Sequence, residues 1–311
     1  MPRWIVCLWM AAACGSVSNS TDGSVQMDAR PIDGAAPDGA IDAPPTARCD
    51  PSRPFDTPVA LSTLNTPQND HIPFLSNDEL TVYFASERPG GSGGFDIYVA
   101  TRSSPTAAFN PPALLNGVNS ADTESRPVLT ADGLALYAEV KRGMNPYHIE
   151  RATRSSTNAS FGALSPVGEL NSTSNDVAPS VLPDHSAIYF VSGRAGNEIY
   201  RAERTGNAFE PPALVSGTSI QSPDTEDYPA VSADELTLYF ATNRPGGAGG
   251  TDIWVATRPS VVQGFSAPEP LAEINTTGEE WPGWISPDGC AFYFARTGSA
   301  GQDIYVAHRP L

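Results

Sequence analysis

The sequence predicts an all-β domain, a five-bladed β-propeller of four-stranded antiparallel blades, over residues 51–311. Three observations lead to it: a long internal repeat, four short strand-like segments in each repeat, and an N-terminal segment that supplies the strand missing from the last repeat. One tyrosine marks each repeat, at Tyr83, Tyr137, Tyr189, Tyr239 and Tyr293. These positions are 54, 52, 50 and 54 residues apart, close to the period of a four-stranded propeller blade.

Each repeat places the same features in the same order. An acidic residue stands three places before a proline, at Asp70, Glu124, Asp176, Glu226 and Glu279. A turn aspartate follows, and then an apolar run, such as residues 80–85, that is typical of a buried strand. A third strand (residues 96–99 in the first repeat) ends on an arginine, and a fourth (residues 109–115) follows a phenylalanine. Because the turn aspartates and strand-end arginines recur in every repeat, we assign them to the fold.

The ring is expected to close through its two ends. The chain ends at Leu311, after the third strand of the fifth repeat. Residues 55–61 match the pattern of the other fourth strands, a phenylalanine followed by a proline and a leucine. Blade five is therefore predicted to contain strands from both ends, which leaves no unpaired final edge.

The repeat resembles that of a known family. Residues 286–289 (Ser-Pro-Asp-Gly), 83–91 and 96–98 resemble the WD-like repeat of TolB-type bacterial propellers. The resemblance implies a propeller fold in a cell-envelope protein, but no single function, since such propellers serve many. The second repeat departs most, because Glu139-Val140-Lys141 replaces the usual Phe-Ala-Ser.

The N-terminal residues predict export. Residues 1–14 contain one arginine, a short apolar run and Ala-Ala-Ala-Cys, which is typical of a signal peptide with a lipobox-like end. We expect lipidation of Cys14 and attachment to the bacterial cell envelope, facing the periplasm or the exterior. Ordinary secretion stays open, because Ala11 stands where a lipobox usually has leucine. Residues 15–50 are rich in Asp, Gly, Ala and Pro and predict a disordered tether.

The charge of the chain limits its partners. Its 18 Lys and Arg against 35 Asp and Glu give a net charge of −17, which repels phosphate backbones and excludes nucleic acid as a natural partner. We expect a monomer that contacts a membrane only through a lipid anchor and binds an envelope protein or a glycan. No cofactor is indicated.

The cysteines predict one disulfide. Cys7 is removed with the signal peptide and Cys14 is lipidated, so Cys49 and Cys290 alone remain in an oxidising compartment. A bridge between them would join the N-terminal strand to blade five. Two free thiols are the alternative.

Two kinds of catalytic site are disfavoured. Residues 90–94 match the Gly-x-Ser-x-Gly nucleophile motif, but they lie in a loop between strands, and the equivalent loop has Ala248 in place of Ser92. No His-Glu-x-x-His or Cys-x-x-Cys occurs and the four histidines fall at unrelated points of the repeat, so no metal site is expected.

The repeated acids are the candidate binding residues. Asp70, Glu124, Asp176, Glu226 and Glu279 enter the innermost strands and are expected to ring the mouth of the central channel; Tyr228, Trp281 and Trp284 accompany them. Aromatic side chains within an acidic rim suit a glycan or a basic peptide. The leading hypothesis is a non-enzymatic envelope scaffold. The alternative is a glycoside hydrolase that uses channel carboxylates, and the acids can also simply pair with arginines of their own blades.

Overall fold

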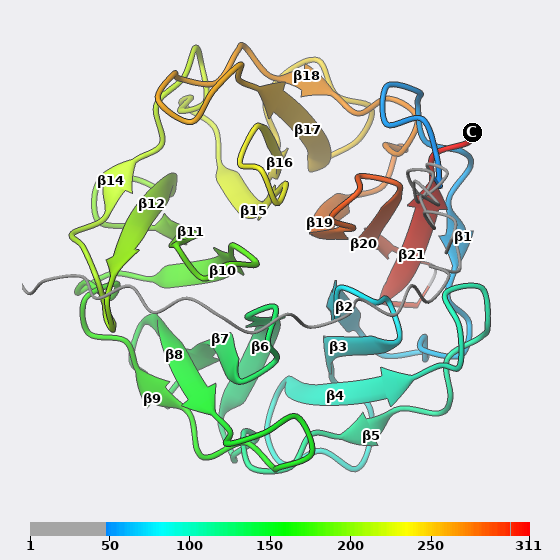
Figure 1. The fold of residues 1–311 in the computed structure, drawn as a ribbon, viewed down its shortest axis with the longest axis vertical. Helices are drawn as coiled ribbons and strands as arrows, with labels where there is room; N and C mark the ends of the chain where they lie inside the picture. The colour runs from blue at the N-terminus through cyan, green and yellow to red at the C-terminus, as the bar shows by residue number, and fades with distance from the viewer. Residues whose placement is uncertain (1–47, 299) are drawn as a thin grey trace, which may run out of the picture. The chain divides into compact units, whose positions relative to one another are not determined.

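The protein is a five-bladed β-propeller, as the sequence predicts. The computed structural model describes residues 48–298 and 300–311. Five antiparallel sheets stand around a ring, each with its first strand nearest the centre (Figure 1). Within the described residues, no helix is long and apolar enough to cross a membrane. The predicted signal peptide, Cys14 and nearly all of the tether lie outside the described residues.

The strands follow the predicted order in every blade. Blade one contains β2 (Asp70–Leu75), β3 (Thr81–Ser86), β4 (Asp96–Thr101) and β5 (Ala113–Leu114); blade two contains β6 (Thr123–Leu129), β7 (Ala135–Lys141), β8 (Tyr147–Thr153) and β9 (Ser165–Pro166). Blade three contains β10 (Asp176–Val181), β11 (Ala187–Ser192), β12 (Glu198–Thr205) and β14 (Ala213–Leu214), with β13 (Ala208–Phe209) paired at the end of β12. Blade four contains β15 (Glu226–Val231), β16 (Thr237–Thr242), β17 (Asp252–Thr257) and β18 (Glu269–Pro270). Blade five contains β19 (Glu280–Ile285), β20 (Ala291–Thr297), β21 (Gln302–His308) and β1 (Val59–Ala60).

The core lies between neighbouring blades rather than within each sheet. The second strands are buried on both faces, as β11 shows along its whole length. One cluster joins Tyr189 of blade three with Phe240 and Trp254 of blade four. Because both faces of these strands pack on a neighbour, their sequences are continuous apolar runs and do not alternate.

Each inner strand carries a β-bulge. In four blades the second residue after the repeated acid has a positive φ: Ile72 (37°), Arg126 (51°), Ala178 (54°) and Tyr228 (53°). In blade five Glu280 takes the place of these acids, and the second residue after it is Pro282, whose ring cannot adopt such a φ. The register shift there falls between Pro282 and Trp284. A Cβ on the intervening Gly283 would lie 2.5 Å from the carbonyl oxygen of Pro73, so this position requires glycine.

The ring closes as predicted, with β1 paired antiparallel to β21. The contact is short, so bonds outside β1 extend it: the backbone N–H of Asp56 donates to the carbonyl of His308 (2.7 Å), and that of Leu61 to Ile304 (2.9 Å). Cys49 and Cys290 form a disulfide with their Cα atoms 5.6 Å apart. The N-terminal segment is thereby attached covalently to blade five.

Candidate functional site

Four of the five predicted acids are buried and do not face the channel as expected. The carboxylates of Asp70, Glu124, Asp176 and Glu226 have no exposed surface. Each pairs with an arginine of its own blade, at 2.6–3.1 Å: Arg88, Arg142, Arg194 and Arg244. The Glu226 carboxylate also accepts a hydrogen bond from the Ser222 hydroxyl (2.5 Å). These ion pairs connect the loop that precedes the inner strand to the loop that follows the second strand. Pairing with arginines of the same blade was the alternative to ligand binding in the sequence analysis.

In blade five the conserved acid is Glu280, and the assignment of Glu279 is one residue off. Glu279 is exposed, whereas Glu280 is fully buried. Glu280 accepts hydrogen bonds from the backbone N–H of Thr276 (3.1 Å) and from Arg296 (3.0 Å). The error arises because blade five places its proline two residues after the acid instead of three.

The three predicted aromatic residues separate into two groups along the channel. We define its upper end as the end where the inner strands begin. Tyr228 and Trp281 meet there, 6.2 Å apart between ring centroids, and His71 packs edge-on against both. Trp284 lies at the lower end, against Phe74.

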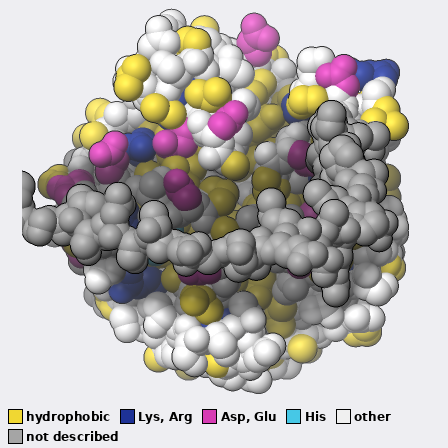
Figure 2. All heavy atoms as spheres, viewed as in Figure 1, with side chains coloured by type: hydrophobic (Ala, Val, Ile, Leu, Met, Phe, Trp, Pro, Cys, Tyr) yellow, Lys and Arg dark blue, Asp and Glu magenta, His cyan; other side chains and the backbone are white. Residues whose placement is uncertain are grey.

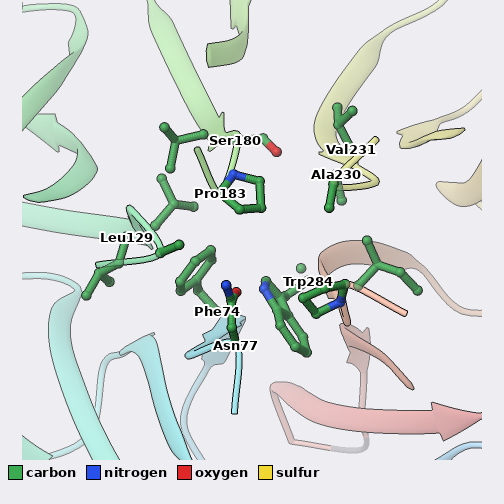
Figure 3. Close-up of a pocket in the computed structure, with 15 residues that line it drawn as sticks. Phe74, Asn77, Leu129, Ser180, Pro183, Ala230, Val231 and Trp284 are labelled. Atoms are coloured by element: carbon green, nitrogen blue, oxygen red, sulfur yellow. The ribbon is translucent and has the colours of Figure 1, made fainter. Parts of the chain in front are cut away.

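The lower end is nearly closed by apolar side chains. Figure 3 shows Phe74, Leu129, Pro183, Ala230 and Trp284 converging on the axis from the five blades. The cavity among them measures only about 40 Å³, room for a few water molecules at most. The upper end is therefore the better candidate for a binding site on the axis.

A larger cavity of about 340 Å³ opens at the upper end. Blades one to four line it with the aromatic rings of His71, Phe95, Tyr147 and Tyr228, the amides of Asn175 and Asn197, and the charged groups of Arg126, Glu139 and Asp227. We call these residues the axial site. Acidic side chains lie across the face seen in Figure 2, in keeping with the net charge of the chain.

Arg126 is the centre of the axial site. It has the positive φ of the bulge and lies with its guanidinium carbon 3.3 Å from the centroid of the Tyr228 ring. It forms ion pairs with Glu139 of its own blade (3.2 Å) and with Asp227 of blade four (3.2 Å). Burial favours the neutral form, but the two carboxylates outweigh it, so the pKa of Arg126 is raised and it stays charged.

The two carboxylates of the site have different surroundings. Glu139 is buried; it accepts hydrogen bonds from the Ser125 hydroxyl (3.3 Å) and the Ala178 backbone N–H (3.2 Å). Burial raises the pKa of Glu139 even though Arg126 opposes that shift. The Asp227 side chain is 28% exposed and bonds to Arg126 through one oxygen.

His71 is held neutral. Burial, and then the charge of Arg126, keep its pKa well below the ordinary value. Its Nε2 lies 3.3 Å from the Tyr228 hydroxyl, while its Nδ1 has no hydrogen-bond partner within residues 48–298 and 300–311.

Sequence reasoning missed the residues at the centre of the axial site: His71, Arg126, Glu139 and Asp227. A signal was present for Glu139, because it breaks the apolar pattern of the second strand in blade two alone. The other three occupy positions whose equivalents have other side chains, and nothing along the chain indicates that they meet.

Comparisons with known proteins identify the fold and no family. No protein-family model matches the chain, and no curated protein sequence matches it significantly. Among solved structures, RS223 β-xylosidase is 12% identical with a TM-score of 0.56, covering 81% of this chain and 94% of that one. A thermostable family-43 glycoside hydrolase is 12% identical with a TM-score of 0.52, covering 77% and 89%.

TolB from Acinetobacter baumannii is 16% identical with a TM-score of 0.49; the match covers 80% of this chain and 56% of that structure. At such low identity the likeness is one of architecture alone. The comparisons agree with the five-bladed propeller fold. They do not indicate the function, which is inferred from the geometry of the axial site.

Proposed function

We propose that this chain is a non-enzymatic binding protein of the cell envelope that takes a neutral sugar unit of a glycan into the axial site. The observation that supports the proposal is the composition of the cavity. Its volume of about 340 Å³ lies within the range of small-molecule sites. It combines several aromatic rings with a few oriented polar groups, the usual pattern of a site for a polyhydroxylated ligand.

The charges of the site favour a neutral ligand. Arg126 is paired with both Glu139 and Asp227. The formal net charge of these three groups is therefore only −1. An anionic ligand would face two carboxylates, and a cationic one would have to displace Arg126 from them. A neutral ligand meets neither cost.

The polar groups are held in place before a ligand arrives. The Asn175 side chain accepts a hydrogen bond from the Tyr147 backbone N–H (3.0 Å), which orients its amide at the cavity. The Tyr228 ring is fixed between Arg126 and His71. Because these side chains are already ordered, binding costs little additional conformational entropy.

Glycoside hydrolysis is the second candidate, and one observation favours it. The reaction needs one protonated and one ionised carboxyl group in different environments. Glu139 is buried with a raised pKa, whereas the Asp227 side chain is 28% exposed, so the two carboxyl groups have different surroundings. The binding role remains the stronger proposal because the Glu139 carboxylate is already bonded to Ser125, Ala178 and Arg126.

The test is a calorimetric screen of neutral oligosaccharides: xylo-, arabino-, cello- and chito-oligomers. Tyr147→Ala removes a ring from the cavity edge and should weaken binding about tenfold. Val262→Ala, at a residue 90% exposed on blade four, is the control that should leave the affinity unchanged. Binding that is indifferent to Tyr147→Ala, or no binding by any neutral glycan, contradicts the proposal.

The same mixtures are then examined for hydrolysis products. Bound but intact oligosaccharide supports the binding role. Cleavage that disappears in Glu139→Gln, a substitution that keeps the shape of the side chain, establishes the enzymatic alternative instead.

A further inference from the structure

The turns that follow the inner strands lie on the face at the lower end of the channel, which we call the lower face. At two of the five blade junctions on this face, a tyrosine, an arginine and an acid meet. The residue after each turn aspartate has a positive φ, and where it carries a side chain, that side chain contacts the core tyrosine of the preceding blade. Between blades three and four, the Tyr189 hydroxyl donates to Glu235 (2.7 Å), and Arg258 donates to Tyr189 (3.1 Å). Between blades five and one, the Tyr293 hydroxyl donates to Glu79 (3.2 Å), and Arg102 donates to Tyr293 (2.8 Å).

Two other junctions complete the contact with different groups. Between blades two and three, His185 Nε2 lies 2.6 Å from the Tyr137 hydroxyl. Between blades four and five, Gly289 provides no side chain, but Arg309 donates to the Tyr239 hydroxyl (3.3 Å), and Pro51 of the N-terminal segment lies 3.8 Å from where a Cβ would stand.

The junction of blades one and two keeps the tyrosine and the arginine but lacks the acid. Gly133 takes the position of Glu79 and Glu235, and a cavity of about 470 Å³ adjoins it. Tyr83 lines this cavity, and its hydroxyl forms no hydrogen bond with any residue of 48–298 or 300–311. Arg154 lines it as well and is partly exposed, whereas Arg102 and Arg258 are buried beneath their carboxylates.

Arg154 is held in the same position as its equivalents. Its Nε donates to the Gly133 carbonyl (2.6 Å), as Arg258 donates to the Glu235 carbonyl (2.7 Å). It stacks on Phe161 at 4.4 Å, the distance at which Arg258 stacks on Phe265. A Cβ built on Gly133 would lie 3.1 Å from its terminal Nη2. The guanidinium is thus preorganised where a carboxylate is bound at the junctions that have one.

The rest of the cavity has an apolar part and a polar part, the polar part including Ser76, Asn77, Thr81, Thr130 and Thr157. Phe74, Leu75 and Leu129 form its wall. Asp78 and Asp132 also lie at its edge, and each accepts hydrogen bonds within its own turn, Asp78 from Ser76 (2.6 Å) and Asp132 from Thr130 (2.5 Å). Unlike Arg126 of the axial site, which is paired with two carboxylates, Arg154 forms no ion pair with either aspartate in the part of the chain that the structure describes. A small ligand with an apolar ring could contact Phe74 and Leu129 while its carboxylate faces Arg154.

We propose that the cavity between blades one and two binds a small organic carboxylate, whose charged group takes the place that Glu79 and Glu235 occupy at the equivalent junctions. Its oxygens would accept hydrogen bonds from Arg154 and Tyr83, and its apolar part would contact Phe74 and Leu129. This site is on the lower face and is independent of the axial site.

Sodium benzoate is the probe, because it combines a carboxylate with an apolar ring, and benzamide is its neutral match. Calorimetric titration of the full chain should give millimolar binding of benzoate and at least tenfold weaker binding of benzamide, since a charged hydrogen bond is replaced by a neutral one. Equal affinity for the two compounds, or no binding of benzoate up to its solubility limit, overturns the proposal.

Three variants locate the site. Gly133→Glu restores the missing acid at a backbone φ of 66°, close to the 59° of Glu79, and should abolish benzoate binding while keeping the fold. Arg154→Gln should weaken benzoate about tenfold, and Tyr83→Phe several-fold. Arg102→Gln, the matched change at the occupied junction, should leave benzoate affinity as it is. Benzoate that binds Gly133→Glu as tightly as the parent lies elsewhere and refutes the assignment.

Discussion

The disulfide between Cys49 and Cys290 provides the sharpest test of how the ring is closed. The two residues are separated by 241 positions, so the bond closes a loop that contains almost the entire propeller. Strand β1 has only two residues, and a few bonds reinforce it, among them the one from the Asp50 N–H to the Pro310 carbonyl (2.9 Å). Removing the disulfide therefore leaves the ring closed only by this short noncovalent contact.

The expected cost follows from the loop length. For a loop of this size, the entropy lost by the unfolded chain corresponds to about 5 kcal/mol at 25 °C. That is a large part of the 5–15 kcal/mol that stabilises a typical protein. Cys49 and Cys290 are both buried, and replacement by alanine removes only one sulfur atom at each position.

Urea unfolding of the parent and of Cys49→Ala/Cys290→Ala measures the effect. We expect the variant to unfold at a clearly lower urea concentration and with a larger m value, because an uncrosslinked chain exposes more surface when it unfolds. Reductant should shift the parent to the midpoint of the variant and leave the variant unchanged. Peptide mapping without reduction should recover the two cysteine peptides as one linked species. Equal midpoints, or two freely alkylated cysteines in the parent, would refute the reasoning.

Three further predictions concern other parts of the chain. Arg244→Ala leaves the buried carboxylate of Glu226 without its partner and should lower the free energy of unfolding by about 3–5 kcal/mol in chemical denaturation; a loss below 1 kcal/mol would show that the pair does not stabilise the blade. Burial, and then two nearby arginines, lower the pKa of His185 from 6.5 to about 4, so the unfolded chain binds this proton more readily, and stability should fall as the pH drops from 6.5 towards 4. His185→Gln should flatten that part of the stability profile, and an unchanged slope would assign the effect to other groups. Cys14→Ala should leave a soluble or unprocessed protein on cell fractionation, whereas membrane association equal to that of the parent would contradict lipid attachment.

The architecture could be predicted from the sequence because its determinants are local or periodic. Continuous apolar runs, turn aspartates and a period near fifty residues identify strands and blades without knowledge of any distant contact. Ring closure was predictable for the same reason, since residues 55–61 repeat a pattern that other blades show. The pairing of Cys49 with Cys290 follows from counting cysteines.

The candidate sites depended on contacts that no local pattern shows. Arg126 and Asp227 are 101 residues apart, and His71 and Tyr228 are 157 apart, yet they meet because inner strands from different blades converge on one axis. The exposure of the repeated acids was also decided in three dimensions. Each acid lies within reach of an arginine on the neighbouring loop, and burying the two charges as a pair avoids the cost of burying either alone.

The cavity at Gly133 depends on both the sequence and the tertiary structure. The sequence by itself determined that residues 79, 133, 185, 235 and 289 are equivalent and that two of them are glycine. Only the tertiary structure decided which residues stand beside them, Arg309 and Pro51 at Gly289 and Arg154 and Thr157 at Gly133, and that a cavity of about 470 Å³ adjoins Gly133. The physical reason is that the neighbours of a blade junction come from segments far apart along the chain, as Pro51 of the N-terminal segment does at Gly289, and no local pattern identifies them.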